Sequence, residues 1–157
     1  MLPATIRRVR DDTDLDAVRT LFWAYAHSLT VDLSYQGFSE EVSTLPAKYA
    51  APAGDLWLAR DQSGEPLGCV GLRPLGGGAC EMKRLYLMPS ARGRRLGHRL
   101  VAAVVVHART VGYREVRLDT LATMLTAIGL YEAFGFERCE PYYAPTPAGT
   151  VFMTLRL

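Results

Sequence analysis

Apolar and polar residues alternate along the chain in a way that predicts strands separated by helices. An acidic cap at residues 11–13 (DDT) precedes apolar residues that recur at helical spacing, namely Leu15, Val18, Leu21, Phe22 and Tyr25. A short helix over 39–45 should end before Pro46. Two more helices are expected, one from the Arg-rich stretch to Gly112 and one over 123–135.

Strands are expected between these helices, with glycine or proline at the turns. Turns at DQSGEP and LGGG join three strands as hairpins, whereas later strand–helix–strand crossovers bring parallel pairing. This order predicts a mixed α/β fold, in which a ligand binds where a strand feeds a helix. The predicted strands are 5–10, 55–60, 66–74, 79–87, 114–121, 136–140 and 151–157.

Length and composition fit one domain over residues 1–157 of an ordinary globular protein. A net charge of +2 with 22% charged residues argues against a general polyanion binder, so we expect no nucleic-acid partner. Cys69, Cys80 and Cys139 lack the spacing of a metal site or redox motif, which predicts buried free thiols, no metal and a cytoplasmic location. No apolar run reaches membrane-spanning length, and the N-terminus has no hydrophobic signal core, so no membrane association is expected.

The stretch PSARGRRLGHRL, residues 89–100, lies where the fourth predicted strand gives way to a helix. A helix start carries about half a positive charge, so an arginine there is unfavourable by roughly 0.3–1 kcal/mol. Gly93 and Gly97 let the backbone approach a ligand closely, and the first amides of a helix converge on one point. We therefore interpret the stretch as a phosphate or pyrophosphate site rather than a solvated basic turn. Its arginines would supply charge-assisted bonds: Arg92, Arg94, Arg95 and Arg99.

Two segments closely resemble the signature motifs of the GNAT N-acetyltransferase superfamily. RLYLMPSARGRRLGHRL, residues 84–100, resembles that family's strand, proline, Arg/Gln-x-x-Gly-x-Gly/Ala loop and helix. AIGLYEAFGF, residues 127–136, resembles its Ala-x-x-Leu-Tyr-x-x-x-Gly-Phe motif. The predicted order of elements is similar to the family's as well. The resemblance implies the GNAT acyl-CoA N-acyltransferase fold, a central mixed sheet of six to seven strands flanked by about four helices.

The resemblance also implies acetyl-CoA as cosubstrate and places it on this sequence. The main chain of the fourth strand would pair with the pantetheine arm, and backbone amides of the loop would wrap the pyrophosphate. In the family, a bulge splays that strand from its parallel neighbour. Apolar residues at 80 and 82 and then at 85 and 87 change phase near Arg84, which fits such a bulge or a strand buried on both faces. The implied cofactor residues are Leu85, Tyr86, Leu87, Arg92, Gly93, Arg94, Arg95, Leu96, Gly97 and His98.

The sequence departs from the family motifs at two positions. Arg95 stands where the first glycine of the loop motif is usual, which is tolerable if its φ is helical and its side chain points away from the pyrophosphate. Met124 stands where the family often has asparagine, and this removes one polar contact to cofactor or substrate.

Acetyl transfer needs a base, an oxyanion site and a proton for the leaving thiolate. Glu81 matches the position of a catalytic glutamate in similar family members, although a structural ion pair with Lys83 or Arg84 is the alternative. Asp119 is a second candidate base, with a helix-cap or turn role as its alternative. A main-chain N–H at Leu87 or its neighbour would meet the oxyanion. Tyr131 would protonate the thiolate, unless it is a core tyrosine.

The acceptor pocket is expected between the first helices and the loops near the C-terminus, as in similar proteins. Aromatic residues there suit an amine with an apolar body, and Glu40 and Glu41 add negative charge. Each aromatic has core or lid packing as its alternative role. The aromatic candidates are Trp23, Tyr25, Tyr35, Tyr142 and Tyr143.

These features favour an acetyl-CoA-dependent N-acetyltransferase that acts on a small-molecule or amino-acid-like amine. A non-catalytic acyl-CoA-binding regulatory module is the alternative, and the orientations of Glu81 and Tyr131 should discriminate the two. Many family members are dimers and C-terminal strands can pair, so a homodimer is an open alternative to a monomer.

Overall fold

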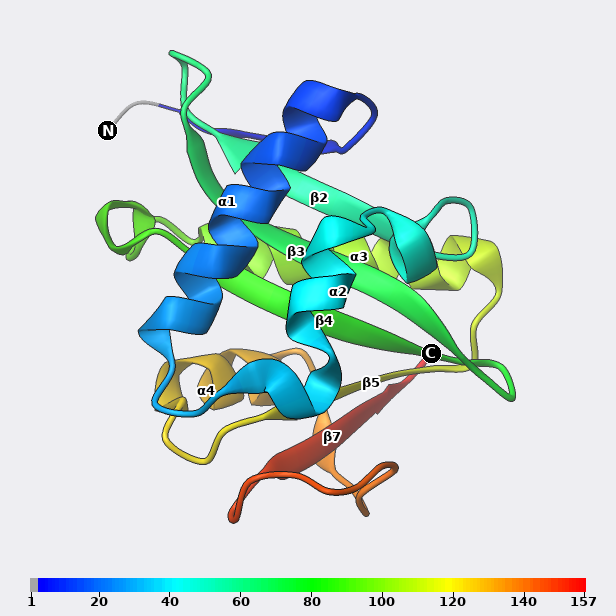
Figure 1. Ribbon diagram of the computed structural model, residues 1–157. Coiled ribbons are helices and arrows are strands. Elements are labelled where there is room, and N and C mark those ends of the chain that lie inside the picture. Colours follow the sequence, from blue (N-terminus) through cyan, green and yellow to red (C-terminus); the bar gives the residue numbers. More distant parts are fainter. Residues whose placement is uncertain (1–2) are drawn as a thin grey trace.

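The computed structural model describes residues 3–157 and has a mixed α/β architecture around one twisted sheet (Figure 1). The sheet has seven strands in the order β1-β2-β3-β4-β5-β7-β6, and β4 and β5 form its parallel pair. The α-helices of the described residues are α1 (Asp12–Ser28), α2 (Phe38–Ser43), α3 (Leu96–Val111) and α4 (Leu125–Ala133). Short 3₁₀ turns are η1 (Leu33–Gln36), η2 (Ala47–Tyr49) and η3 (Pro89–Ala91). The strands are β1 (Thr5–Arg8), β2 (Asp55–Arg60), β3 (Pro66–Gly76), β4 (Ala79–Leu87), β5 (Glu115–Thr120), β6 (Glu137–Arg138) and β7 (Val151–Arg156).

The helices cover the two faces of the sheet and divide the core in two. In Figure 1, α1 and α2 lie in front of the sheet, and α3 lies behind it. The front core includes Val18 and Phe22 of α1 and Phe38 of α2. The rear core contains one stripe of α3 together with Ile128 and Tyr131 of α4. The predicted mixed sheet of six to seven strands with about four helices is thereby confirmed.

Strand β4 changes its pairing partway along its length, and this change opens the sheet. Its parallel pairing with β5 extends only from Ala79–Glu115 to Glu81–Arg117. Against β3, the three residues from Cys69 to Gly71 oppose the four from Lys83 to Tyr86, so β4 carries an extra residue. Arg84 adopts a left-handed backbone with φ of 61° at this place. Of the two interpretations left open for the change of phase near Arg84, the structure shows the bulge, and it bends β4 away from β5.

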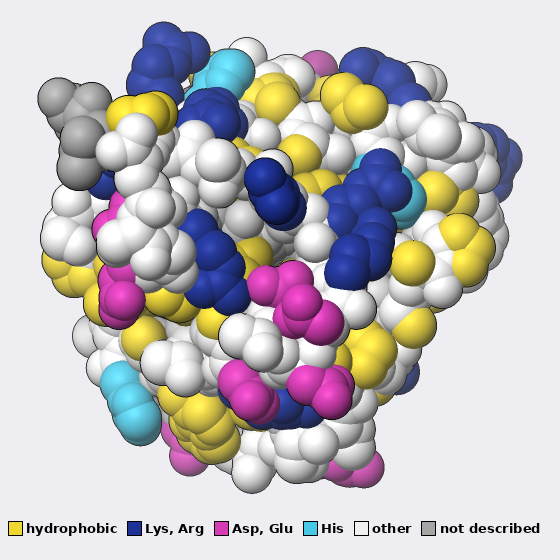
Figure 2. Space-filling view, turned by 90° about the horizontal axis from the view of Figure 1, so that it is seen from above, with side chains coloured by type: hydrophobic (Ala, Val, Ile, Leu, Met, Phe, Trp, Pro, Cys, Tyr) yellow, Lys and Arg dark blue, Asp and Glu magenta, His cyan; other side chains and the backbone are white. Residues whose placement is uncertain are grey.

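The outer edge of the sheet at β1 is covered by charge. β1 pairs only with β2, and its Arg7 and Arg8 are exposed. Figure 2 looks onto this edge and shows Lys and Arg side chains spread across it, with a group of acidic side chains beside them. Nη1 of Arg10, two residues beyond β1, lies 3.0 Å from Oδ1 of Asp55. Charged side chains along an open edge discourage the addition of another strand.

Several boundary predictions and one burial prediction need correction. β1 ends at Arg8 rather than at residue 10, β3 extends to Gly76, and α4 is shorter than the predicted 123–135. The last but one strand, expected over 136–140, is only the two residues of β6, because Pro141 follows closely and cannot donate to a ladder. The short second helix begins at Phe38 and ends at Ser43. Cys139 is half-buried rather than buried, and all three cysteines are free thiols. None of the helices within residues 3–157 combines the length and apolar character that crossing a membrane requires.

Candidate active site

The loop between β4 and α3 presents a row of backbone amides. Gly93 has φ of 78° and Arg95 has φ of 58°, and α3 begins directly after Arg95 without a side-chain cap. Within residues 3–157, the backbone amides of Leu96, Gly97 and His98 donate no hydrogen bond to protein. A left-handed residue next to a helix start forms a concave nest of N–H groups that suits an anion. The open amides expected at the start of this helix are therefore present.

The backbone at Arg95 corrects one expectation. A helical φ was expected to make this side chain tolerable, yet Arg95 lies in the left-handed region. An L-residue there is strained by roughly 1–2 kcal/mol, because its Cβ approaches the following carbonyl. Glycine, which is usual in the family at this motif position, would carry no such strain.

Replacing Arg95 by glycine is expected to raise the free energy of unfolding by about 0.5–1 kcal/mol, because the relieved strain exceeds the entropy that glycine adds to the unfolded chain. Arg95→Val is expected to lower it by about 1–2 kcal/mol, since a β-branched residue tolerates this backbone worst. Urea unfolding of the three proteins measures both changes. A glycine variant less stable than the valine variant would contradict the left-handed assignment.

Gly97, Arg92 and Arg99 also make packing or hydrogen-bond contacts within the protein. A Cβ at Gly97 would lie 3.3 Å from Cδ2 of Leu130, so this glycine lets α3 pack tightly against α4. Arg99 donates to the carbonyl of Ala4 at 3.2 Å and so ties α3 to the N-terminal segment. Arg92 is exposed and donates from Nε to the carbonyl of Leu87 at 3.3 Å. Of the four arginines, Arg99 thus has a structural partner outside the loop.

The remaining predicted cofactor residues lie where β4 and β5 diverge. Beyond Glu81 no ladder joins the two strands among the described residues, so the main chain of Leu85–Leu87 lacks a β5 partner. Leu85 and Leu87 pack toward α3, and Tyr86 points to the opposite core, where its ring meets that of Tyr25 edge-on. We call this divergence of β4 from β5 beyond Glu81 the slot.

A salt bridge spans this slot. Continuing the register of β4 and β5 by two residues places Lys83 opposite Asp119, and Nζ of Lys83 lies 3.3 Å from Oδ1 of Asp119. Both side chains are buried, 4% and 7% exposed. Burial lowers the pKa of Lys83, although the carboxylates of Glu81 and Asp119 act in the opposite direction. Asp119 is therefore a strand residue with a charged partner, not a helix cap or a turn residue.

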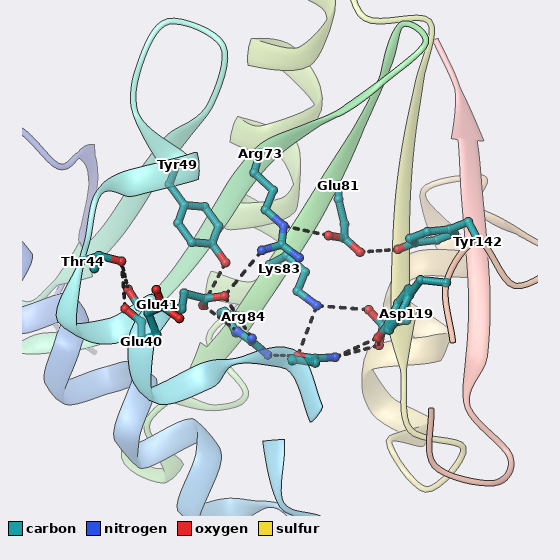
Figure 3. A network of polar contacts seen from close by, with 12 residues as sticks. Glu40, Glu41, Thr44, Tyr49, Arg73, Glu81, Lys83, Arg84, Asp119 and Tyr142 are labelled. Atoms are coloured by element: carbon teal, nitrogen blue, oxygen red, sulfur yellow. Dashed lines mark hydrogen bonds and ion pairs between the residues drawn. The ribbon is translucent and has the colours of Figure 1, made fainter. Parts of the chain in front are cut away.

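Glu81 is held from both sides on the front face of the sheet (Figure 3). Its Oε1 accepts a hydrogen bond of 2.9 Å from Nε of Arg73, which lies directly opposite on β3. Its Oε2 accepts one from the hydroxyl of Tyr142 in the β6–β7 loop. The expected alternative, a pair with Lys83 or Arg84, is wrong, because the cross-strand neighbour is nearer than residues further along the same strand. The Glu81 side chain is only 1% exposed.

Tyr143 bonds the second candidate base, Asp119, just as Tyr142 bonds Glu81. Tyr143 donates to Oδ2 of Asp119 at 2.8 Å, and Gln36 bonds both the Tyr143 hydroxyl and Asp119. Tyr142 and Tyr143 thus each bond one of the two candidate bases. Burial, together with the charge of Glu81, raises the pKa of Tyr142, so its phenol stays protonated.

A second buried ion pair joins α2 to the bulge. Arg84 bonds Glu41 through Nε at 3.0 Å and Nη2 at 3.2 Å, and it also donates to Gln36 at 2.6 Å. Its guanidinium lies 4.9 Å from the ring centre of Phe38. Three cations and three anions make up the whole network, so its formal charge is zero. They are Arg73, Lys83, Arg84, Glu41, Glu81 and Asp119.

Tyr131 lies in the rear core behind the slot. Its ring packs against Phe136, and it is 7% exposed. Burial raises the pKa of Tyr131, with smaller contributions from Tyr25 and from Asp119. The phenol of Tyr131 therefore stays protonated at neutral pH.

The residues predicted for the acceptor pocket are only partly brought together. Tyr142 and Tyr143 lie at the network, and Tyr25 borders the slot beside Lys83. Trp23 is 40% exposed and stacks on His27. Tyr35 lies in η1, and its side chain falls outside what the structure describes. Glu40 and Glu41 both line a cavity between α2, η2 and β3.

Sequence reasoning missed Arg73 and Gln36 as parts of this site. Arg73 is the one charged residue in the apolar strand segment PLGCVGLRP, a signal that could have marked it. Gln36 carries no local signal, because its role depends on partners far away in the chain.

Comparisons with known proteins identify relatives over nearly the whole chain. The model of the Acetyltransferase (GNAT) family matches residues 15–136. An uncharacterised N-acetyltransferase of Schizosaccharomyces pombe is 40% identical over 154 residues, which cover 98% of this chain and 94% of the relative. The uncharacterised N-acetyltransferase YjgM of Escherichia coli is 31% identical over 134 residues, 83% of this chain and 78% of that protein. A crystal structure of a GNAT-family acetyltransferase from Staphylococcus aureus superposes with a TM-score of 0.82 at 16% identity, over 98% and 99% of the two chains.

Proposed function

Because this chain belongs to the GNAT acetyltransferase family, we propose that it transfers an acetyl group from acetyl-CoA to a primary amine of a small-molecule or amino-acid-like acceptor. The observation that carries the proposal is the slot between β4 and β5, which has open loop amides at one end and two buried carboxylates beside it. An elongated cosubstrate with an anionic tail and a reactive head matches this layout.

The cofactor would lie along the slot with its pyrophosphate at the start of α3. The amides of Leu96, Gly97 and His98, together with the exposed Arg92, support this placement. The pantetheine amides would pair with the main chain of Leu85–Leu87, which has no β5 partner. No group of three or more His, Cys, Asp or Glu residues in the described part of the chain is arranged to hold a metal ion.

Direct transfer gives Glu81 and Tyr131 distinct roles. Glu81 takes a proton from the acceptor ammonium, directly or through water, so that the amine nitrogen can attack the thioester carbon. A main-chain N–H of β4 at Leu87 or its neighbour stabilises the oxyanion, and the C–S bond then breaks. Tyr131, whose phenol burial keeps protonated, donates to the leaving thiolate. Asp119 paired with Lys83 is the competing base.

Acetyl-CoA is expected to raise the melting temperature of the protein and to release free thiol when a suitable amine is present. Arg92→Ala should weaken the thermal response, because it removes a charge from the pyrophosphate end. Scanning calorimetry with acetyl-CoA, combined with thiol detection over an amine panel, tests both parts.

Three outcomes of this experiment are informative. The absence of any thermal shift with acetyl-CoA or CoA would overturn the cofactor assignment. Binding without thiol release from any amine would favour the regulatory module. An unchanged thermal response in Arg92→Ala would show that this arginine does not contact the cofactor. Arg109→Ala, in the last turn of α3, is the matched control.

A further inference from the structure

A cavity of about 250 Å³ lies between α2, η2 and β3, and its lining includes Arg73, the hydrogen-bond partner of the candidate base Glu81. Pockets for drug-sized ligands measure about 300–1,000 Å³, so this cavity suits a smaller molecule. Four charged residues line it: Glu40, Glu41, Lys48 and Arg73. Figure 3 shows Arg73 between Glu41 and Tyr49 on one side and Glu81 on the other.

Arg73 has spare hydrogen-bonding capacity at this cavity. Its guanidinium carries five N–H donors, of which only Nε is used, toward Glu81 at 2.9 Å. Nη1 lies 3.6 Å from Glu41, beyond hydrogen-bond distance, and Nη2 has no partner among residues 3–157. The side chain is 20% exposed and lines the cavity. The terminal fork of an arginine matches the two oxygens of a carboxylate.

The acidic residues of the cavity leave the terminal N–H groups of Arg73 without a hydrogen-bond acceptor in the described part of the chain. Glu41 already accepts from Tyr49 at 3.0 Å and from two nitrogens of Arg84, so its oxygens are occupied. Lys48 is exposed and forms no ion pair in the described part of the chain, which adds a second cation at the cavity. Glu40, also exposed, has no ion-pair partner there either.

We infer that the acceptor is an α-amino acid or a similarly compact amine with a carboxylate on the carbon that bears the nitrogen. Its carboxylate binds the fork of Arg73 and the ammonium of Lys48. This inference rests on the proposed acetyltransferase function and names the acceptor class for that site.

The same placement brings the amine to the base. In an α-amino acid the nitrogen lies two bonds from the carboxylate carbon. A carboxylate on the Nη edge of Arg73 therefore holds the nitrogen near Glu81, which bonds the same guanidinium through Nε. An amine at the far end of a long side chain would lie away from Glu81. Arg73 thus acts as a specificity-determining residue as well as a partner of Glu81.

Paired acceptors test the inference on the full-length protein. Each pair consists of an α-amino acid and its α-carboxamide, which keep the same nitrogen and side chain, and thiol release from acetyl-CoA gives kcat/KM. The kcat/KM of the free acid is expected to exceed that of the amide by at least about 10-fold, mostly through a lower KM, because only the acid makes a charge-assisted contact with Arg73. Amines that lack the carboxylate altogether should have kcat/KM values as low as those of the amides.

Variants assign the preference to its residues. Lys48→Met replaces an exposed side chain and is expected to reduce the preference for acid over amide several-fold, through a higher KM for the acid. Arg109→Met, an exposed cation of α3, is the matched control and should preserve the preference. Arg73→Lys keeps the charge without the fork, and its KM for the acid should rise.

The outcomes separate this inference from the function beneath it. Equal rates for acids and amides would overturn the carboxylate assignment while leaving the acetyltransferase in place. The same holds for a preference that Lys48→Met and Arg73→Lys both leave intact. Failure to acetylate any amine would overturn the function itself.

Discussion

Glu81→Gln is expected to lower kcat for amine acetylation by about 10²–10⁴-fold, the usual contribution of a general base. The substituted amide can still accept from Arg73, but it cannot take a proton from the acceptor ammonium. Acetyl-CoA binding should persist, because the slot and the loop amides lie on other residues. Steady-state thiol release together with calorimetric binding measures the two effects separately.

The pH profile distinguishes loss of a base from a loss of shape. A free amine has a pKa of about 10, so without a base the rate should follow the free-amine fraction and rise with pH toward that value. A merely distorted site would lower the rate equally at every pH. Glu65→Gln, at an exposed turn, is the matched control and should behave as wild type. A Glu81→Gln enzyme with full turnover would remove Glu81 from the mechanism.

Asp119→Asn decides between the two carboxylates in the same assay. If Asp119 only balances Lys83 across the slot, its loss should affect stability and cofactor affinity more than the pH profile. A profile that follows the free-amine fraction in Asp119→Asn, but not in Glu81→Gln, would assign the base to Asp119.

Local sequence patterns were sufficient for most elements of the fold. β2 and β4 have the bounds that alternation and flanking turns predict, and α3 ends at Val111 with Gly112 as its C-cap, where the sequence predicts the stop. The bulge near Arg84 left a trace in the sequence, because an extra residue shifts the apolar period of a strand by one, but a strand buried on both faces would have the same pattern. These features depend on residues that are neighbours in the chain.

The pairing within the site could not be read in the same way. Tyr142 meets Glu81 across 61 positions, and Arg84 meets Glu41 across 43. Such contacts depend on how β3, β4, α2 and the β6–β7 loop come together, which no local period encodes. The cross-strand pair of Arg73 and Glu81 follows from the register of the β3–β4 hairpin. The sequence does not fix this register, because the hairpin has an irregularity between Pro74 and Gly76.

The backbone of Arg95 was missed for a different reason. Arginine has a high helix propensity, so the sequence suggests a helical backbone at position 95. The turn from η3 into α3 instead needs a left-handed residue there. Tertiary context therefore overrides a preference of roughly 1–2 kcal/mol.

Arg84→Met is expected to lower the free energy of unfolding by about 3–5 kcal/mol, the usual effect of removing one partner of a buried ion pair. The Arg84 side chain is 2% exposed, and its loss leaves Glu41 buried with only Tyr49 and the more distant Arg73. Methionine keeps a long, non-glycine side chain at the same left-handed backbone, so strain there is unchanged. Urea unfolding monitored by tryptophan fluorescence measures the loss.

The double variant Arg84→Met/Glu41→Gln should be more stable than Arg84→Met alone, because no uncompensated charge then remains buried. The pH dependence of the free energy of unfolding gives a second test. Burial tends to raise the pKa of Glu41, but the hydrogen bonds and charges of Arg84 and Arg73 hold it below the ordinary value. The stability that the pair contributes is therefore present above the unfolded carboxyl pKa of about 4.3 and is lost as pH falls through the lower folded value.

The difference in stability between wild type and Arg84→Met should accordingly be full at neutral pH and shrink below about pH 4. Asp16→Asn breaks the exposed pair of Asp16 with Arg19 and is the matched control, with an expected effect within about 1 kcal/mol. A loss in Arg84→Met no larger than this control would mean that α2 is not held to the bulge by the Glu41–Arg84 pair. A loss that persists undiminished in acid would instead assign the stability to packing of Arg84 against Phe38.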